Sequence, residues 1–131
     1  MSYMLDTNIC VFMLNQEPGV LHRFQAAMSD GVCISVITLA ELEYGVSKSA
    51  RKEHNTSALA AFLALVDVLP FDIPATGEYG QIRATLARAG HVIGSLDMLI
   101  AAHAKSENLT LVTNNTREFK RVDGLRLEDW R

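Results

Sequence analysis

The sequence is poor in the features that mark secreted and membrane proteins. Its 131 residues include only two cysteines, Cys10 and Cys33, and neither has the spacing of a metal finger. Both lie in apolar segments, so we expect reduced core thiols. No apolar run approaches the ~18 residues of a membrane span. No basic stretch followed by an apolar core opens the chain, which indicates a cytoplasmic protein without a signal peptide.

Positive charge is also scarce. Lysine and arginine number 12 against 15 aspartates and glutamates, which gives a net charge of −3 and a pI of about 5.7. A global positive field that attracts nucleic acid is therefore excluded. If the substrate is a nucleic acid, a local basic patch and a bound metal must attract it.

Apolar residues, in contrast, are plentiful. They make up 49% of the chain, and the mean hydropathy is +0.13. Without a membrane span, this excess indicates either a dense core or a surface buried against a partner. A chain of this length buries roughly two-thirds of its unfolded surface, so we expect a single domain over 1–131 with no membrane partner.

Short apolar runs alternate with amphipathic segments along the chain. We expect strands at 3–6, 32–35, 68–71 and 109–113, and an edge strand within 125–130. Between them, helical spacing predicts helices at 7–16, from Pro18, at 38–49, up to Val66, at 75–89, 96–108 and 116–122. This alternation predicts the α/β class, with a parallel sheet of four to five strands covered on both faces.

Three acids stand where predicted helices begin. Asp6 follows the first strand, Glu41 follows the second strand, and Asp97 follows a glycine-bounded loop. One interpretation is purely structural, because exposed amides and the macrodipole stabilise acids in a first helical turn. In that interpretation Thr38 and Glu41 form a capping box, Ser95 caps the helix of Asp97, and Asp6 is itself a cap.

The other interpretation is functional. Ligands of α/β proteins gather at the carboxyl ends of the parallel strands, where Asp6 and Glu41 both fall. Carboxylates that converge there repel one another unless a cation compensates, and hard oxygen ligands suit Mg²⁺ or Mn²⁺. Such ions support hydrolysis of phosphodiester bonds. We therefore predict that Asp6, Glu41 and Asp97 hold the metal and carry the catalysis.

Other polar residues are candidates for supporting roles. Thr7 follows Asp6, while Thr113 and Asn115 follow the fourth strand, so their side chains either assist the metal and phosphate or cap the next turn. Glu118 is either an outer ligand or a surface acid.

Several basic side chains flank the segments that carry these candidates. Arg83, Arg88 and Arg117 are candidate phosphate contacts, although a solvated helix surface also explains each of them. His103 falls on an apolar helical face and is expected to be a core histidine.

Five motifs together resemble the PIN domain, in particular the VapC ribonuclease toxins of bacterial toxin–antitoxin pairs. They are MLDTN at Asp6, SVITLAELEYG around Glu41, GSLDMLIAAHA around Asp97, and TNNTREF with the closing LRLEDW. The resemblance implies an α/β/α sandwich and a Mg²⁺-dependent endoribonuclease, with Mn²⁺ as a substitute, whose core acids are Asp6, Glu41 and Asp97. It also implies a homodimer and a cognate VapB-type antitoxin that blocks the cleft.

One position departs from the family pattern. Many PIN domains carry an acid where this sequence has Asn115. Either Glu118 supplies the fourth carboxylate, or a second metal binds mainly together with the substrate. The neutral residue is similar to the enteric branch of these toxins, which implies tRNA as the substrate, including initiator tRNA cut in the anticodon region.

Two other functions compete with this interpretation. A phosphotransfer receiver domain also gathers acids and Mg²⁺ at strand ends, but it needs an aspartate and a lysine where this sequence has Ser35 and Asn114-Asn115. The stronger competitor is a catalytically silent PIN module that binds RNA or a protein partner. The neutral Asn115 keeps this alternative open, because an acid of many PIN domains is missing at that position.

Overall fold

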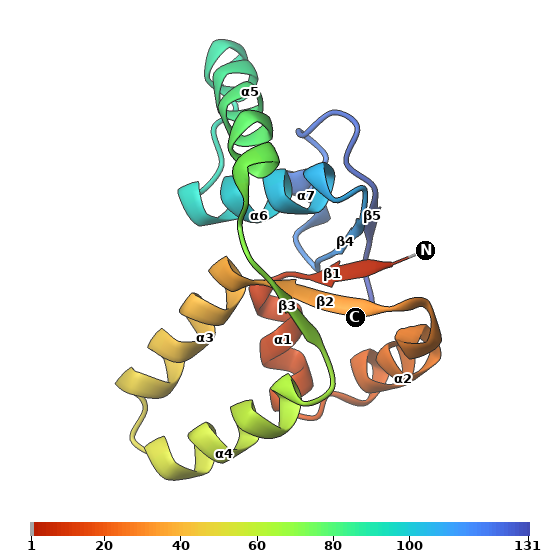
Figure 1. Cartoon of the computed structure of the whole chain (residues 1–131), viewed down its shortest axis with the longest axis vertical. Coiled ribbons are helices and arrows are strands. Elements are labelled where there is room, and N and C mark those ends of the chain that lie inside the picture. Colours follow the sequence, from red (N-terminus) through yellow and green to blue (C-terminus); the bar gives the residue numbers. More distant parts are fainter. Residues whose placement is uncertain (1) are drawn as a thin grey trace.

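A five-stranded parallel sheet forms the centre of the molecule (Figure 1). The computed structural model describes residues 2–131. The strand order is β3-β2-β1-β4-β5, and all four pairings are parallel. The strands are β1 (Tyr3–Leu5), β2 (Val32–Ser35), β3 (Asp67–Leu69), β4 (Thr110–Val112) and β5 (Leu127–Glu128). The prediction of an α/β protein with a parallel sheet of four to five strands is confirmed.

Helices cover both faces of this sheet. On one side lie α1 (Thr7–Leu14), α2 (Pro18–Ala27), the short 3₁₀ helix η1 (Met28–Asp30), α3 (Val36–Lys48) and α4 (Lys52–Leu63). On the other lie α5 (Ile73–Ala89), α6 (Ser95–Ser106) and α7 (Thr116–Phe119). Figure 1 shows the two groups on opposite sides of the strands. In the part of the chain that the structure describes, no helix has the length and apolarity to cross a membrane.

Alternating side chains in the strands build one core on each face. In β1, Met4 faces the core under α5, α6 and α7, whereas Leu5 faces the core under α1 to α4. Their neighbours in register follow the same alternation: Cys33 and Leu111 beside Met4, and Ile34 and Val112 beside Leu5. Cys10 and Cys33 are both buried free thiols, as predicted.

The start of α3 differs from its prediction. The helix begins at Val36, directly after β2, because the Ser35 hydroxyl accepts a hydrogen bond from the Ile37 N–H at 3.1 Å and so caps the helix. Thr38 lies buried inside the first turn. The predicted capping box of Thr38 and Glu41 is therefore wrong.

The other two predicted caps have different outcomes. Asp6 is the N-cap of α1, and its carboxylate accepts from the Ile9 N–H at 3.0 Å, as one of its two interpretations predicted. Ser95, however, is the first residue of α6, and Gly94 is the cap residue without any side-chain bond. The prediction that Ser95 caps the helix of Asp97 is wrong, because the helix begins one residue earlier than the sequence pattern indicated.

The last residues close the face covered by α1 and α2. Trp130 is only 2% exposed, and its ring lies 5.4 Å from that of Tyr3 in an edge-to-face contact. Its indole N–H donates to the Glu128 carboxylate at 2.9 Å, and Glu128 also pairs with Arg23 at 3.1 Å. Trp130 thus joins the chain's end to the central strand and to α2.

Replacing this anchor should destabilise the whole domain. We expect Trp130→Ala to lower the free energy of unfolding by about 3–5 kcal/mol, because it leaves a cavity in the core. Urea unfolding followed by circular dichroism measures this loss. Tryptophan fluorescence does not serve, because Trp130 is the only tryptophan in the chain and the variant lacks it. The control Trp130→Phe keeps an aromatic ring and should lose less. A loss below about 1 kcal/mol for the alanine variant would show that the closing segment is peripheral.

Candidate active site

The chain leaves the carboxyl ends of two neighbouring strands, β1 and β4, toward opposite faces of the sheet. After β1 it enters α1 on one face, whereas after β4 it enters α7 on the other face. Neighbouring strands whose connections diverge in this way leave room for ligands at their carboxyl ends. Asp6 directly follows β1 and Thr113 directly follows β4, and the Asp6 N–H donates to the Val112 carbonyl at 2.9 Å.

Asp6 is a buried carboxylate held on two sides. Its side chain, in a residue only 4% exposed, accepts from the Ile9 N–H and from the Thr113 hydroxyl. The pKa of Asp6 is raised from 3.8 to about 6. Burial is the largest cause, the two hydrogen bonds act in the opposite direction, and the charges of Asp97 and Glu41 add to the rise. The predicted supporting residue Thr113 therefore contacts the first acid directly.

Glu41 reaches the site from α3. Its carboxylate accepts from the Thr7 hydroxyl at 2.5 Å, so Thr7 positions the second acid. Glu41 is half-buried, whereas the next residue, Leu42, belongs to the core. Glu41 therefore lies off the core face of α3.

Asp97 completes the set from the first turn of α6. Burial raises its pKa, and the charges of Glu118 and Glu41 raise it further, so Asp97 lies within electrostatic reach of both acids. Glu118 in turn accepts from the Asn115 amide at 2.8 Å. Asn115, which stands where many PIN domains have a fourth acid, is therefore hydrogen-bonded to Glu118, the residue that could replace that acid. This bond holds Glu118 beside Asp97.

The donor set fits a hard divalent cation. Within residues 2–131 no three His, Cys, Asp or Glu side chains lie close enough together to hold a metal ion by themselves. The two ion pairs in the same part of the chain, Arg23–Glu128 and Lys105–Glu78, also leave these acids without a basic partner. Neighbouring carboxylates raise the pKa of Asp6 and of Asp97. Carboxylate oxygens in such surroundings, without a cationic neighbour, are suited to bind Mg²⁺ or Mn²⁺.

A buried hydrogen bond joins the two helices that carry Glu41 and Asp97. The Ser35 hydroxyl lies 2.7 Å from Nδ1 of His103, which is fully buried, as predicted for a core histidine. Burial lowers the pKa of His103, whereas the charges of Glu107 and Asp72 and a hydrogen bond to the Pro70 backbone act in the opposite direction. The two residues are 68 positions apart, and no sequence signal pointed to this link between α3 and α6.

The three predicted phosphate contacts remain predictions. Arg83, Arg88 and Arg117 are exposed, and Arg83 donates to the Tyr79 hydroxyl at 2.7 Å. Arg117 lies on α7 beside Glu118, whereas Arg83 and Arg88 lie on α5. The structure shows no hydrogen bond between them and the three acids among its described residues.

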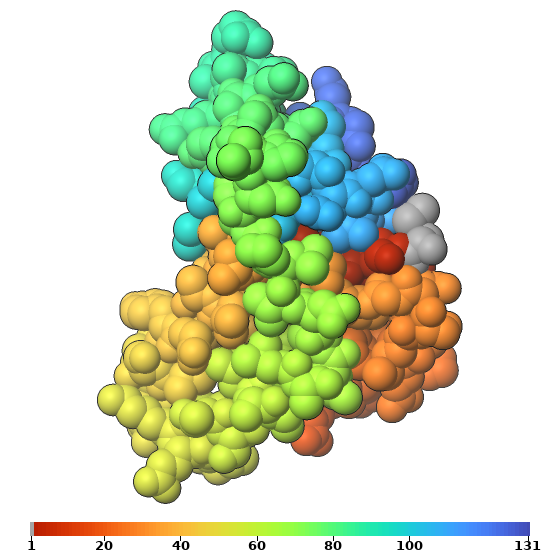
Figure 2. Space-filling model, in the orientation of Figure 1, coloured from red at the N-terminus to blue at the C-terminus, as the bar shows by residue number. Residues whose placement is uncertain are grey.

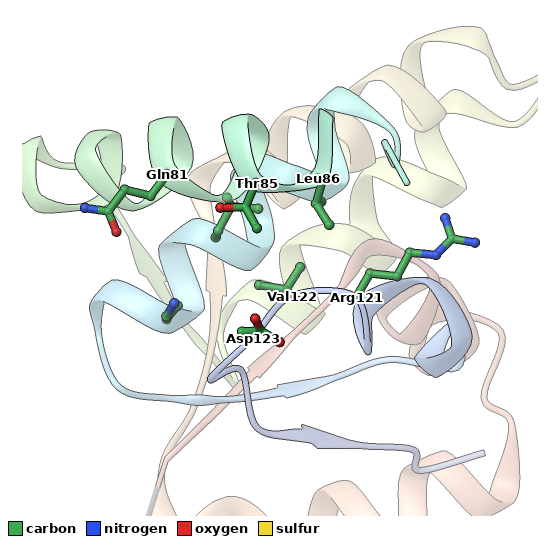
Figure 3. Close-up of a pocket in the computed structure, with 8 residues that line it drawn as sticks. Gln81, Thr85, Leu86, Arg121, Val122 and Asp123 are labelled. Atoms are coloured by element: carbon green, nitrogen blue, oxygen red, sulfur yellow. The ribbon is translucent and has the colours of Figure 1, made fainter. Parts of the chain in front are cut away.

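Two hollows differ in their relation to the acids. A cavity of about 90 Å³ between α5 and the 121–123 segment has room for a few waters. Figure 3 shows Gln81 and Thr85 on one side of it, with Arg121 extending away from Asp123. A hollow of about 620 Å³ instead opens beside Thr7 and Glu41, between α1, α3 and α4. The lining residues Tyr44 and His54 were not predicted from the sequence, because both lie on polar helix faces.

The comparisons with known proteins agree with this geometry. The PIN domain model matches residues 3–125. The chain is also 49% identical to the tRNA(fMet)-specific endonuclease VapC of Shigella flexneri, over 99% of this chain and 98% of the relative. The chain is a PIN-domain protein of the VapC family. It is 48% identical to Ribonuclease VapC2 of Rickettsia felis, with the same coverage.

Solved structures extend the likeness of this VapC-family protein to three dimensions. The VapBC2 complex from Rickettsia felis, bound to a promoter DNA fragment, matches with a TM-score of 0.96 and 47% identity over 100% of both chains. The DNA-bound VapBC complex from Salmonella typhimurium matches with a TM-score of 0.95 and 45% identity, over 100% of this chain and 99% of that one. PIN-domain nucleases generally use divalent metal ions, which the donor set described above fits.

The pKa of Asp6 leads to a prediction about stability. The pKa of Asp6 is about 6 in the folded protein, above its ordinary value of 3.8, so the folded state binds the Asp6 proton more tightly than the unfolded state. The stability that this proton contributes is complete below about pH 4 and is lost as the pH rises through 6. Asn carries no such proton. Without metal, the free energy of unfolding of Asp6→Asn should therefore rise by about 2–3 kcal/mol relative to that of the wild type between pH 4 and pH 6. Urea unfolding across the pH series measures the difference.

Divalent metal provides the control for this measurement. Mg²⁺ should stabilise the wild type above about pH 6, because it binds the folded acids, and should stabilise Asp6→Asn much less. A stability difference between the two proteins that does not change with pH would contradict the buried, proton-binding state of Asp6.

Proposed function

We propose that this protein is the ribonuclease toxin of a VapBC toxin–antitoxin pair, and that it hydrolyses phosphodiester bonds in RNA with Mg²⁺ held by Asp6, Glu41 and Asp97. The observation that supports this most strongly is the convergence of these acids, without a basic partner among the described residues, at the diverging ends of β1 and β4. The ribonuclease names of the relatives support the same activity.

The chain's own residues prepare the site for this chemistry. Thr113 and the Ile9 amide fix the Asp6 carboxylate, and Thr7 fixes that of Glu41. When bound, a divalent cation supplies Lewis acidity at a phosphate oxygen. Cys10, the thiol nearest to Asp6 in sequence, is fully buried and its pKa is raised well above the ordinary value, so it does not serve as a nucleophile.

The substrate and partner follow from the relatives. Two of them, from Shigella flexneri and Salmonella typhimurium, are named tRNA(fMet)-specific endonucleases. We infer that initiator tRNA, cut in the anticodon region, is the substrate here as well. The solved VapBC complexes support a VapB-type antitoxin as the partner that blocks the cleft.

The metal site can be tested by removing single carboxylates. Asp6→Asn and Asp97→Asn should each reduce Mg²⁺-dependent cleavage of initiator tRNA by more than the about 10–100-fold typical of changes around a metal site. The matched control is Asp67→Asn, because Asp67 is the first residue of the edge strand β3, whereas the three acids follow the last residues of strands or begin a helix near them. Gel analysis of labelled tRNA, with EDTA and added Mg²⁺ or Mn²⁺, measures the rates.

Other outcomes of this assay favour different conclusions. Undiminished cleavage by either acid variant would refute the metal site. Equal cutting of initiator and elongator methionine tRNA would refute the substrate preference alone. A wild-type protein that binds tRNA but never cuts it would favour the catalytically silent module.

A homodimer is part of the same proposal. Three apolar side chains, Val36, Val68 and Ile73, are exposed near the β3 edge of the sheet, and Ile73 is 84% exposed. Exposed apolar groups that gather at one edge are typical of a surface buried against a partner.

Light scattering on the protein without its antitoxin tests the dimer. The wild type should have the mass of two chains at micromolar concentration, and Ile73→Asp should shift it to one, because a charge at the interface is costly to bury. Met28→Asp serves as the control. Met28 is also an exposed apolar residue, but it lies in η1, before the amino end of β2 and away from Ile73. A monomeric wild type would contradict the prediction.

A further inference from the structure

The hollow beside Glu41 continues as a groove that leads away from the acids. We call it the α1–α3–α4 groove. Its polar lining includes Thr7, Glu41, Tyr44, Lys48, Arg51 and His54, and apolar side chains such as Val11, Leu14 and Val46 also line it. Thr7 and Glu41 lie at its inner end and are hydrogen-bonded to each other. Figure 1 shows α3 and α4 as the two arms of a hairpin, with α1 across its open side, and Figure 2 shows this hairpin projecting from the body of the molecule.

One face of α3 lines this groove with an ordered series of side chains. Glu41, Tyr44, Gly45 and Lys48 recur at helical spacing, so they lie on one side of the helix, over about 10 Å of its length. Gly45 leaves the middle of the series open, since a Cβ added there would meet no atom within 4 Å. The order along the groove is therefore acid, aromatic ring, open floor and cation.

Tyr44 is a ring with a free face. It is 66% exposed, which is unusual for a large aromatic side chain. The Lys48 ammonium lies 5.0 Å from the ring centroid on one face, as in a cation–π pair. The opposite face is available for stacking, and every nucleic acid base has a flat surface that can stack on it.

The outer part of the groove is basic, although the protein as a whole carries a net charge of −3. Lys48, Arg51 and His54 line it, and Glu41 is its only acid among the described residues. Neither Lys48 nor Arg51 takes part in the two ion pairs found within residues 2–131. Cations without acidic partners beside an exposed ring are suited to phosphates next to a stacked base.

We propose that the α1–α3–α4 groove binds the single-stranded RNA next to the scissile phosphate, with one base stacked on Tyr44 and the adjoining phosphates bound by Lys48 and Arg51. This deepens the proposed ribonuclease function and rests on it. Glu41 belongs to the groove and to the proposed metal site, because it lies at the inner end of the groove next to the other acids. A flanking strand in this groove places the bond to be cut beside Asp6 and Asp97.

RNA binding in a non-cleaving background tests the groove separately from the chemistry. All variants carry Asp6→Asn, and the probe is a labelled single-stranded RNA of about 12 nucleotides, followed by fluorescence anisotropy. Tyr44→Ala should weaken binding about tenfold, whereas Tyr44→Phe, which keeps the ring, should bind like the parent. Arg51→Gln should reduce the slope of log Kd against log salt by about 0.7, the value for one phosphate contact.

Two further variants separate groove binding from general effects. Lys52→Gln is the matched charge control, because Lys52 adjoins Arg51 on α4 but does not line the groove. It should leave the salt slope unchanged. Gly45→Leu removes no contact and raises helix propensity, but it fills the open floor. It should therefore weaken RNA binding while leaving the thermal unfolding temperature equal or higher.

Each outcome decides between occupants of the groove. If Tyr44→Ala, Gly45→Leu and Arg51→Gln all bind RNA like the parent, the RNA path is wrong and the groove serves a protein partner. An equal change of slope in Arg51→Gln and Lys52→Gln would also overturn it, since binding would then follow overall charge. If the groove variants lose RNA binding but the protein with Asp6 intact never cleaves, the groove stands and the proposed ribonuclease function fails.

Discussion

The burial of the Asp6 carboxylate at the end of the central strand is the constraint on which the site depends. A carboxylate removed from water is costly unless hydrogen bonds or a cation compensate for the lost hydration. The Ile9 amide and the Thr113 hydroxyl supply part of this compensation, and they tie Asp6 to α1 and to the end of β4. The hydration free energy that these hydrogen bonds do not replace raises the pKa of Asp6. It also gives the carboxylate the affinity for positive charge that a metal site requires.

The strand order converts this local constraint into a shared site. Because β1 lies between β2 and β4, the segments that follow all three strands meet around Asp6. Helix α3 contributes on two sides, with Leu42 in the core and Glu41 toward the groove. The bond between Ser35 and His103 then fixes α3 against α6, so the acids on these helices keep a defined separation.

The sequence predicted the elements whose signals are local. Apolar runs and helical spacing located the strands and helices, and the strand ends indicated Asp6 and Glu41, because that signal needs only neighbouring residues. Ser35 was missed as a cap, since it also ends a buried strand and its hydroxyl serves α3 and His103 together. Tyr44 and His54 were missed because a groove depends on how helices diverge, which the pattern of one helix does not contain.

The pairing of β1 with β4 also has a consequence for how the protein is made. Tyr3 pairs with Thr110, so the central strand has its second neighbour only after most of the chain has left the ribosome. Contacts between such distant segments form late, because the intervening chain must first be ordered. Until β4 docks, the Thr113 hydroxyl cannot reach the Asp6 carboxylate, which then lacks one of its two hydrogen-bond donors. The contact that fixes Asp6 is thus among the last that a newly made chain can form.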